Sequence, residues 1–379
     1  MVWRRWAGLR PTGIDRICLA WIQHYAQRSQ AVIIHRHGRA ILPVRASQAL
    51  FRLLAAPESE ALARAGFRMR LVALALRHGF GLAAGLTGRG RLWLNPGHTG
   101  LDAPGLADWC QNVGVRPLYL VHDLIPITHP QFCRAGEAAR HRRRMRTMLE
   151  TGHALVANSS DTLEQVSAFA AREGLRVPPA VVAWPGTFRL PHAAVHTPAV
   201  PTFVVLGTIE GRKNHQLLLG IWERMWRVMG ADAPRLVIIG RRGWQAQAVF
   251  SQLEARGFGD RVLEAGALDD DGIARHVSGA RALLFPSHAE GYGLPLAEAL
   301  AAGVPSIASD LGVFREIGQG VPDLLPLEDP GAWQEAILDY ARPDSTRRAA
   351  QMARMRGFRA PAWDDHFAKV DMVLEGAAC

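Results

Sequence analysis

The chain has few of the residues that would indicate a disulfide-stapled, zinc-bound or membrane-spanning protein. Four of its 379 residues are cysteines and no two of them form a C-x-x-C pair, since they stand at Cys18, Cys110, Cys133 and Cys379. This spacing argues against a disulfide framework or a zinc site and for a reducing compartment. The longest apolar region, residues 71–86, contains Arg77 and His78 and is too short to cross a bilayer. No secretory signal is visible, because residues 1–6 lack a following apolar core.

Lysine is almost absent, although the formal net charge is +10; Lys213 and Lys369 are the only two. An arginine-based surplus is typical of proteins that meet nucleic acid, an anionic membrane surface or phosphorylated substrates. No nucleic-acid-binding motif accompanies it, so a membrane surface and phosphates are favoured and no nucleic-acid partner is expected. The length and the 49% share of hydrophobic residues suit a globular protein of two domains, each with its own core.

One stretch in the C-terminal third combines three features of an anion site. Residues 282–285 are an apolar run that predicts a buried parallel strand, and a glycine loop, Gly291-Tyr292-Gly293, follows it. Pro295 suits the first turn of a helix that Gly303 ends. Glycines let backbone N–H groups approach a ligand closely, and a helix N-terminus favours negative charge.

Two carboxylates, Glu290 and Glu298, frame this stretch. Beside a phosphate they would repel it, unless they accept hydrogen bonds from hydroxyl groups of the same ligand. A diphosphate between two polyhydroxylated rings satisfies both requirements, so the stretch predicts a site for a nucleotide sugar. The alternative is an ordinary strand–loop–helix unit with two surface glutamates.

The sequence Pro-Ser-X-X-Glu-Gly-Tyr-Gly-Leu-Pro, with seven residues between Glu290 and Glu298, resembles the E-x7-E signature of retaining glycosyltransferases of family 4. The resemblance implies an α/β chain with the GT-B fold, in which two Rossmann-like domains face a central cleft. A proline-rich stretch near residues 178–201 suggests the boundary. We therefore expect an acceptor-binding domain over residues 1–195, a nucleotide-sugar-binding domain over 196–355, and a last helix within 356–379 that crosses back to the first domain.

In the resembling family, the loop after the first strand of the second domain supplies an arginine and a lysine to the donor diphosphate. Lys213 matches that lysine, but Thr208 stands at the usual arginine position, and Arg212 is expected to compensate. The variant Gly-Thr-Ile-Glu-X-Arg-Lys-Asn resembles a subset of bacterial polysaccharide enzymes, several of which transfer mannose from GDP-mannose.

The resemblance assigns the remaining donor contacts. Glu290 would hold hydroxyl groups of the transferred sugar and Glu298 those of the nucleotide ribose. The other donor-binding positions are expected near the base or the diphosphate, at Gly266, Leu268, Gly291, Tyr292, Gly293 and Leu294.

In the first half of the chain, a hydrophobic strand from residue 116 delivers His122 at its C-terminal end, followed by Asp123 and Pro126. This resembles the H-D-x-x-P element of the family, whose histidine lies beside the donor sugar; the alternative is a histidine that merely closes a strand. His98 lies in a turn and could reach an acceptor, but a histidine in a turn is more often simply solvated.

Gly13 matches the glycine that approaches the donor diphosphate in this family, and residues 14–25 predict an amphipathic helix after it. Little apolar sequence precedes this glycine. Either residues 1–6 form a stub of the first strand, or the protein begins upstream of Met1.

A helix over residues 137–152 carries five arginines, and two interpretations are open: a solvated face, or a face for an anionic membrane. The five arginines are Arg140, Arg142, Arg143, Arg144 and Arg146.

The combined prediction is a retaining, metal-independent glycosyltransferase with no cofactor and with His122, Lys213 and Glu290 as its catalytic residues. It would move a hexose, with mannose from GDP-mannose favoured, onto a lipid-diphosphate-linked saccharide in bacterial surface polysaccharide synthesis. It would work in the cytoplasm, on the inner membrane. The alternatives are a UDP-sugar-dependent transferase, a GT-B sugar-nucleotide epimerase and a non-catalytic binding protein.

Overall fold

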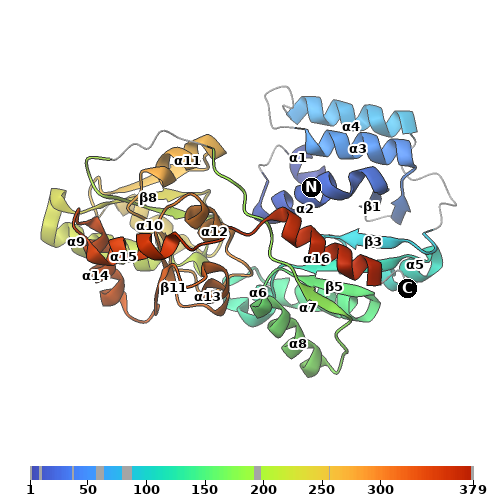
Figure 1. Cartoon of the computed structure of the whole chain (residues 1–379). Coiled ribbons are helices and arrows are strands. Elements are labelled where there is room, and N and C mark those ends of the chain that lie inside the picture. Colours follow the sequence, from blue (N-terminus) through green and yellow to red (C-terminus); the bar gives the residue numbers. More distant parts are fainter. Residues whose placement is uncertain are drawn as a thin grey trace.

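The computed structural model describes residues 2–7, 11–35, 38–56, 64–78, 88–191, 198–255 and 257–376. They form two lobes, each built on a parallel β-sheet (Figure 1). The last helix, α16 (Trp363–Gly376), lies on the first lobe. There the indole of Trp21 donates a hydrogen bond to His366, and the Tyr25 hydroxyl donates one to Asp371.

The first lobe contains a four-stranded parallel sheet in the order β3-β4-β5-β6. Its strands are β3 (Leu92–Asn95), β4 (Arg116–Val121), β5 (Ala154–Ala157) and β6 (Ala180–Val182). Apart from its first residue, β4 is buried along its length, as expected of an apolar run in a sheet covered on both faces. The surrounding helices are α5 (Leu106–Val113), α6 (Ile125–Thr128), α7 (Glu137–Thr151) and α8 (Ser160–Glu173).

The N-terminal part of this lobe is mostly helical. It contains one antiparallel pair of strands, β1 (Val32–His35) and β2 (Gly38–Ile41). The predicted helix is confirmed as α2 (Gly13–Tyr25), which Thr12 begins through a capping box with Asp15. The remaining helices here are α1 (Val2–Trp6), α3 (Val44–Ala55) and α4 (Arg64–His78).

The predicted strand stub over residues 1–6 is wrong, because Val2–Trp6 is the helix α1. A strand needs a neighbour for its backbone hydrogen bonds, whereas this short segment is helical and contacts α4. Of the apolar region 71–86, residues up to His78 lie in α4 and residues 79–86 lie outside the described residues. No helix among the described residues is long and apolar enough to cross a membrane.

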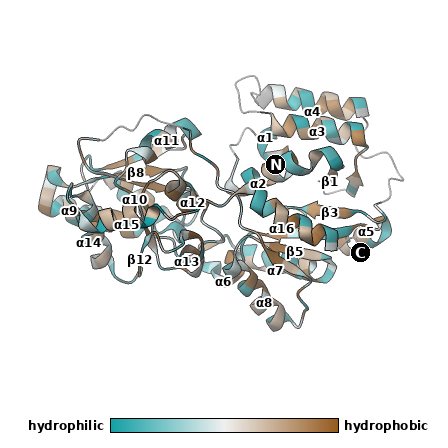
Figure 2. Cartoon of the chain, in the orientation of Figure 1, coloured by the Kyte–Doolittle hydropathy of each residue, from teal (hydrophilic) through white to brown (hydrophobic). Residues whose placement is uncertain are grey.

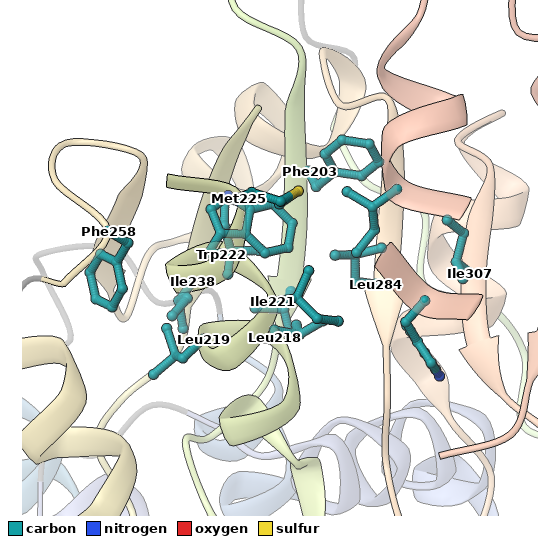
Figure 3. Close-up of a cluster of buried hydrophobic side chains, with 14 of the residues drawn as sticks. Phe203, Leu218, Leu219, Ile221, Trp222, Met225, Ile238, Phe258, Leu284 and Ile307 are labelled. Atoms are coloured by element: carbon teal, nitrogen blue, oxygen red, sulfur yellow. The ribbon is translucent and has the colours of Figure 1, made fainter. Parts of the chain in front are cut away.

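The second lobe contains a six-stranded parallel sheet in the order β12-β11-β10-β7-β8-β9. Five of its strands are β7 (Thr202–Leu206), β8 (Arg235–Ile239), β9 (Val262–Gly266), β10 (Ala282–Phe285) and β11 (Ser306–Ser309), and β10 confirms the buried strand expected at residues 282–285. One face packs on α9 (His215–Met229), where Trp222, Met225 and Leu219 meet strand residues such as Ile238 and Leu284 (Figure 3). The other helices are α10 (Gln247–Ala255), α11 (Asp270–Ser278), α12 (Leu294–Ala301), α14 (Pro330–Ala341) and α15 (Thr346–Met355).

Two elements of this lobe were not predicted. They are the helix α13 (Gly312–Gly318) and the edge strand β12 (Asp323–Leu325), which pairs with β11. Strand order changes direction between β10 and β7, so the loops after these two strands open at one edge of the sheet.

Candidate functional site

The loops after β7 and β10 place a buried ionic cluster at the carboxyl edge of the second sheet. Oε1 of Glu290 accepts hydrogen bonds from the Lys213 ammonium and the Ser287 hydroxyl, and lies 2.7 Å from Nη1 of Arg212. Burial opposes ionisation of Glu290, but the charges of Arg212 and Lys213 outweigh it and hold the pKa of that carboxyl at about 2. The structure thus brings together Arg212, Lys213 and Glu290, three of the residues predicted to bind the donor.

The Lys213 side chain lies in a narrow slot. Its Nζ is 4.5 Å from the centroid of the Phe285 ring, and its Cε would lie 3.4 Å from a Cβ on Gly207. Gly207 has φ +142°, a backbone conformation that glycine adopts readily. A Cβ here would make only an ordinary van der Waals contact with the lysine stem, so the backbone conformation rather than space favours glycine at this position.

The second signature glutamate is bound to the other lobe. Glu298 lies in α12 with 4% of its surface exposed, and its Oε1 is 2.8 Å from Nη1 of Arg16 in α2. Burial raises the pKa of Glu298 to about 7, against the opposing charge of Arg16. The Arg16 guanidinium also stacks on the ring of Phe188 at 4.0 Å from its centroid.

The same contact between lobes includes Gly13 and Leu294, the first residues of α2 and α12. A Cβ on Gly13 would lie 2.9 Å from Cδ1 of Leu294, so the leucine side chain would have to shift to admit it. The structure thus brings together the predicted residues Gly13, Leu294 and Glu298, from helices far apart in the sequence.

His122 lies at the carboxyl end of β4 and is 3% exposed. Its Nε2 is 2.7 Å from the carbonyl oxygen of Pro96, which can only accept, so Nε2 carries the proton and Nδ1 does not. Burial lowers the pKa of His122, which keeps the ring neutral. His98, expected to be solvated in its turn, is instead half-buried: its Nε2 accepts a hydrogen bond from the backbone N–H of His122 at 3.4 Å, and the two ring centroids are 5.0 Å apart. The turn therefore packs against the end of β4, and the expectation of a fully solvated side chain is wrong.

The loop after β10 touches the end of β4 at Gly291. A Cβ at this position would lie 2.0 Å from the carbonyl oxygen of His122, so only glycine fits. The Gly291 carbonyl accepts hydrogen bonds from the hydroxyls of Ser159 (3.0 Å) and Thr162 (3.1 Å) at the start of α8. The glycine of the signature therefore closes the contact between the lobes beside His122.

The remaining predicted donor residues fall into two groups. Gly293 (φ +94°) precedes α12, and Gly266 (φ +70°) ends β9 with open space around it. The side chains of the other three pack against protein: the Tyr292 hydroxyl donates to the Pro185 carbonyl, Thr208 lies against Gly243, and Leu268 borders the cluster around Ile239. At Tyr292, a ligand would therefore meet the backbone and not the side chain.

The arginines of α7 are mostly engaged in ion pairs. Arg140 and Arg144 pair with Asp102, and Arg146 pairs with Glu173 at 2.7 Å. Arg142 lies 3.8 Å from the same glutamate. This pairing favours the interpretation of α7 as a solvated face. Among the described residues no group of three or more His, Cys, Asp or Glu could hold a metal ion; metal independence stays a prediction.

Comparison with known proteins decides the family of the second lobe. Residues 200–342 match the family described as Glycosyl transferases group 1. This part of the chain is a group 1 glycosyltransferase domain. It contains β7 to β10, the Lys213–Glu290 cluster and Glu298, so the predicted family resemblance is confirmed.

Two kinds of relatives extend this finding. The chain is 28% identical over 230 residues to the serotype-specific mannosyltransferase WbdA of Escherichia coli, covering 56% of this chain and 28% of that protein. It is 31% identical over 172 residues to the phosphatidyl-myo-inositol mannosyltransferase of Mycobacterium leprae, covering 45% and 44%. The chain thus spans less than a third of the length of WbdA and under half of the mycobacterial enzyme.

Solved structures confirm the GT-B fold. The chain aligns with Anabaena Alr3699/HepE at a TM-score of 0.62 and 13% identity, covering 97% of both chains. It aligns with a sucrose-phosphate synthase from Thermosynechococcus elongatus at a TM-score of 0.54 and 18% identity, covering 92% and 86%. At these identities the likeness establishes the fold of both lobes.

Sequence reasoning missed Arg16, Ser159 and Thr162. Each is an ordinary residue in its local context: Arg16 is in the first turn of a helix, and Ser159 and Thr162 form a standard N-cap. One signal did exist, since an arginine in a first turn opposes the helix dipole. Its partner Glu298 lies 282 positions away, which no local pattern reveals.

Proposed function

We propose that the protein is a retaining mannosyltransferase that moves mannose from GDP-mannose to a saccharide acceptor in bacterial surface polysaccharide synthesis. The observation that carries the proposal is the buried cluster in which the Glu290 carboxylate binds both Lys213 and Arg212. Glu298 lies in α12, the helix that follows the Glu290 loop. The relatives named above as mannosyltransferases support mannose as the transferred sugar.

The cluster suits a donor whose leaving group is a diphosphate. Two cations, Arg212 and Lys213, stand on one loop at a sheet edge, beside the start of α12. A diphosphate carries the charge that these groups bind, and its negative charge grows as the bond to the sugar breaks. Arg212 and Lys213 would stabilise the leaving diphosphate without a metal ion, as the sequence suggested.

The two glutamates divide the rest of the donor. Glu290, charged at neutral pH because its pKa is about 2, would accept hydrogen bonds from mannose hydroxyls. Glu298 would accept them from the ribose, in place of its bond to Arg16. His122 would lie beside the sugar and orient it, since its neutral ring offers Nδ1 as an acceptor.

In the proposed reaction, the bond between C1 of mannose and the diphosphate oxygen breaks and a bond from C1 to an acceptor hydroxyl oxygen forms on the same face. The hydroxyl proton passes to the departing diphosphate, and GDP leaves. Departure and attack on one face retain the anomeric configuration and require no strongly basic side chain beside C1. No cofactor takes part.

Nucleotide binding tests this function most simply. A ligand that binds only the folded protein raises its unfolding temperature by mass action. We expect GDP and GDP-mannose to stabilise the protein more than UDP, ADP or their sugars. Stronger stabilisation by UDP-sugars would mean that the donor is a UDP-sugar and not GDP-mannose. Turnover of a sugar nucleotide to a free epimer, with no acceptor present, would replace the transferase by an epimerase.

The acceptor is proposed to be a lipid-diphosphate-linked saccharide, reached from the cytoplasm at an anionic inner-membrane surface. Helix α4 supports this part. Three of its large apolar side chains, Met69, Val72 and Leu76, are 68%, 46% and 82% exposed and share one face by their spacing. Arg70 and Arg77 are exposed on the same helix, which has no acidic residue. Figure 2 shows apolar and polar residues along this outer helix.

An exposed apolar face with arginines and no carboxylates is typical of helices that lie on anionic membranes. We expect sedimentation with phosphatidylglycerol vesicles and little with phosphatidylcholine vesicles. Leu76→Glu should lower the bound fraction severalfold. Val228→Glu is the matched control, because Val228 is 86% exposed on α9 of the other lobe. Equal losses in both variants would contradict a membrane role for α4.

A further inference from the structure

A cavity of about 480 Å³ lies on the seam between the lobes, apart from the cluster around Glu290. Gln131 and Phe132 line it from the first lobe, and Asn214, His215, Gln245 and His288 line it from the second. Its volume is within the roughly 300–1,000 Å³ of small-molecule sites. The helices α9 and α10 both begin at this cavity.

The side chain that points to a ligand here is His215. It is 1% exposed, and within the described part of the chain neither of its ring nitrogens has a hydrogen-bond partner. Burial lowers the pKa of His215 to about 4, so the ring is neutral, with one nitrogen donating and the other accepting. Buried polar groups are nearly always paired, so a polar molecule in the cavity would complete this histidine.

The chemistry of the lining is polar but uncharged. None of the described residues that line the cavity is Asp, Glu, Lys or Arg. Amides from Gln131, Asn214 and Gln245 both donate and accept hydrogen bonds. The rings of Phe132 and His288 stack with centroids 4.8 Å apart and add a flat apolar surface. Amides with a ring surface suit a neutral ligand rich in hydroxyls, whereas a phosphate would call for a cation.

Two of the lining residues have unusual backbone conformations. Asn214 and Gln245 have φ of +52° and +50°, and only one other non-glycine residue of the described chain, Gln319, has a positive φ. Such conformations cost free energy and cluster at ligand sites. The side chain of Gln245 also donates to the Cys133 carbonyl, which joins the lobes at the cavity.

A wall of backbone separates this cavity from the donor cluster. The amide of His288 donates to the carbonyl of Arg212 at 2.8 Å and joins the two loops. The Lys213 and Arg212 side chains turn from this loop to Glu290, which does not line the cavity. A molecule in the cavity is therefore not the sugar being transferred.

We propose that this cavity binds a neutral saccharide unit of the acceptor, remote from the hydroxyl that receives mannose. The assignment of this saccharide to the acceptor rests on the proposed function. The saccharide site itself rests on His215, the amides and the stacked rings. A remote subsite of this kind would select acceptors by the sugars they already carry.

The test is calorimetric binding of mannobiose, a neutral disaccharide, to the whole protein without donor. Gln131→Ala, on the exposed rim, and His215→Phe, which preserves the ring volume, should each raise the dissociation constant by about fivefold or more through a lost hydrogen bond. Gln111→Ala is the matched control, since Gln111 is exposed on α5 away from the cavity, and should bind as the wild type does. Saturating GDP should not displace the disaccharide.

Four results would overturn the proposal: no binding of mannobiose, equal binding by all variants, competitive displacement by GDP, or displacement by inorganic phosphate. The last result would make the cavity an anion site. Mannose transfer is measured separately. If both variants transfer mannose normally and bind the disaccharide as the wild type does, the saccharide site is refuted and the proposed function is kept. Absent transfer with the expected binding pattern refutes the proposed function and leaves the saccharide site.

Discussion

Arg16 of α2 and Glu298 of α12 form an ion pair of 2.8 Å that joins the two lobes at the predicted nucleotide site. The carboxyl is buried, with a pKa raised to about 7, and the arginine is its partner from the other lobe. Because the same carboxylate is expected to hold the ribose, nucleotide binding and the contact between lobes share one group. The donor would release Arg16 as it binds.

Arg16→Met should therefore destabilise the protein in a pH-dependent way. Without its partner Glu298 stays buried, and its folded pKa rises further above the ordinary value of 4.5. A raised carboxyl pKa gives stability at low pH that is lost as pH rises through the folded pKa. We expect a loss of about 3 kcal/mol in unfolding free energy at pH 8 and a smaller loss at pH 5.5, measured by urea unfolding.

Arg28→Met provides the control for that series. Arg28 also forms an ion pair, with Asp371, but its side chain is 61% exposed. Its removal should change stability by less than about 1 kcal/mol at either pH. A pH-independent effect of Arg16→Met would mean that Glu298 does not respond to its partner.

Glu298→Gln should weaken GDP binding by about 1–3 kcal/mol, the range for a lost charge-assisted hydrogen bond. Because the pKa of Glu298 is about 7, wild-type affinity for GDP should fall as pH drops from 8 to 6 and the carboxylate is protonated. The variant should lack this dependence. Calorimetry at both pH values checks it, and parallel pH profiles for the two proteins would contradict the assignment.

Glu290→Gln should behave in the opposite manner. It should abolish transfer, since the contacts to mannose hydroxyls weaken, while GDP affinity is kept or increased. The increase follows because Lys213 and Arg212 lose a carboxylate that competes with the diphosphate for them. Binding and turnover are measured on the same preparation, and a variant that loses both would show that Glu290 mainly holds the loop in place.

Lys213→Arg should cost most of the activity. The ammonium fits between Glu290 and the Phe285 ring, over Gly207, and a planar guanidinium is wider than this slot. Lys213→Ala should lose donor binding. Steady-state kinetics with the donor varied will distinguish these effects, and near-normal turnover by Lys213→Arg would indicate a cation with no steric requirement.

Gly291→Ala should separate the lobes at His122. The added methyl group would lie 2.0 Å from the His122 carbonyl, a backbone atom that cannot move aside alone. We expect a large fall in kcat/KM and a lower melting temperature. Gly220→Ala in α9 is the control, because its Cβ would meet only the flexible end of Arg224 at 3.8 Å. Similar behaviour of both variants would refute the close contact as the cause.

Much of the fold could be predicted because its strands are buried apolar runs. β4 and β10 each carry such a run, which ends in a loop with predicted site residues. The edge strand β12 escaped prediction because its three residues, Asp323–Leu325, are too few to show a period. One of the two alternatives for residues 1–6, a strand stub, is wrong because only the place of this segment in the chain, and not its residue pattern, suggested a strand.

The site residues could likewise be predicted only in part. Glu290, Gly291 and Glu298 could be found because they stand in one short contiguous motif of specific chemistry, and Lys213 because it stands in a second such motif after β7. Tyr292 belongs to the same motif, yet its side chain is buried by contacts with Pro185, which is distant in sequence. Sequence patterns therefore identify residue types and spacing, whereas the direction of each side chain depends on partners brought together by folding.

The configuration of the product tests the central claim most directly. The protein is incubated with GDP-mannose and a mannoside acceptor. The one-bond coupling between C1 and H1 of the new linkage, which differs between α- and β-mannosides, is then measured by NMR. Because the mannosyl group of GDP-mannose is α-linked, the account predicts an α-mannoside from the wild type and no product from Glu290→Gln. A β-linked product, or undiminished transfer by Glu290→Gln, would contradict it.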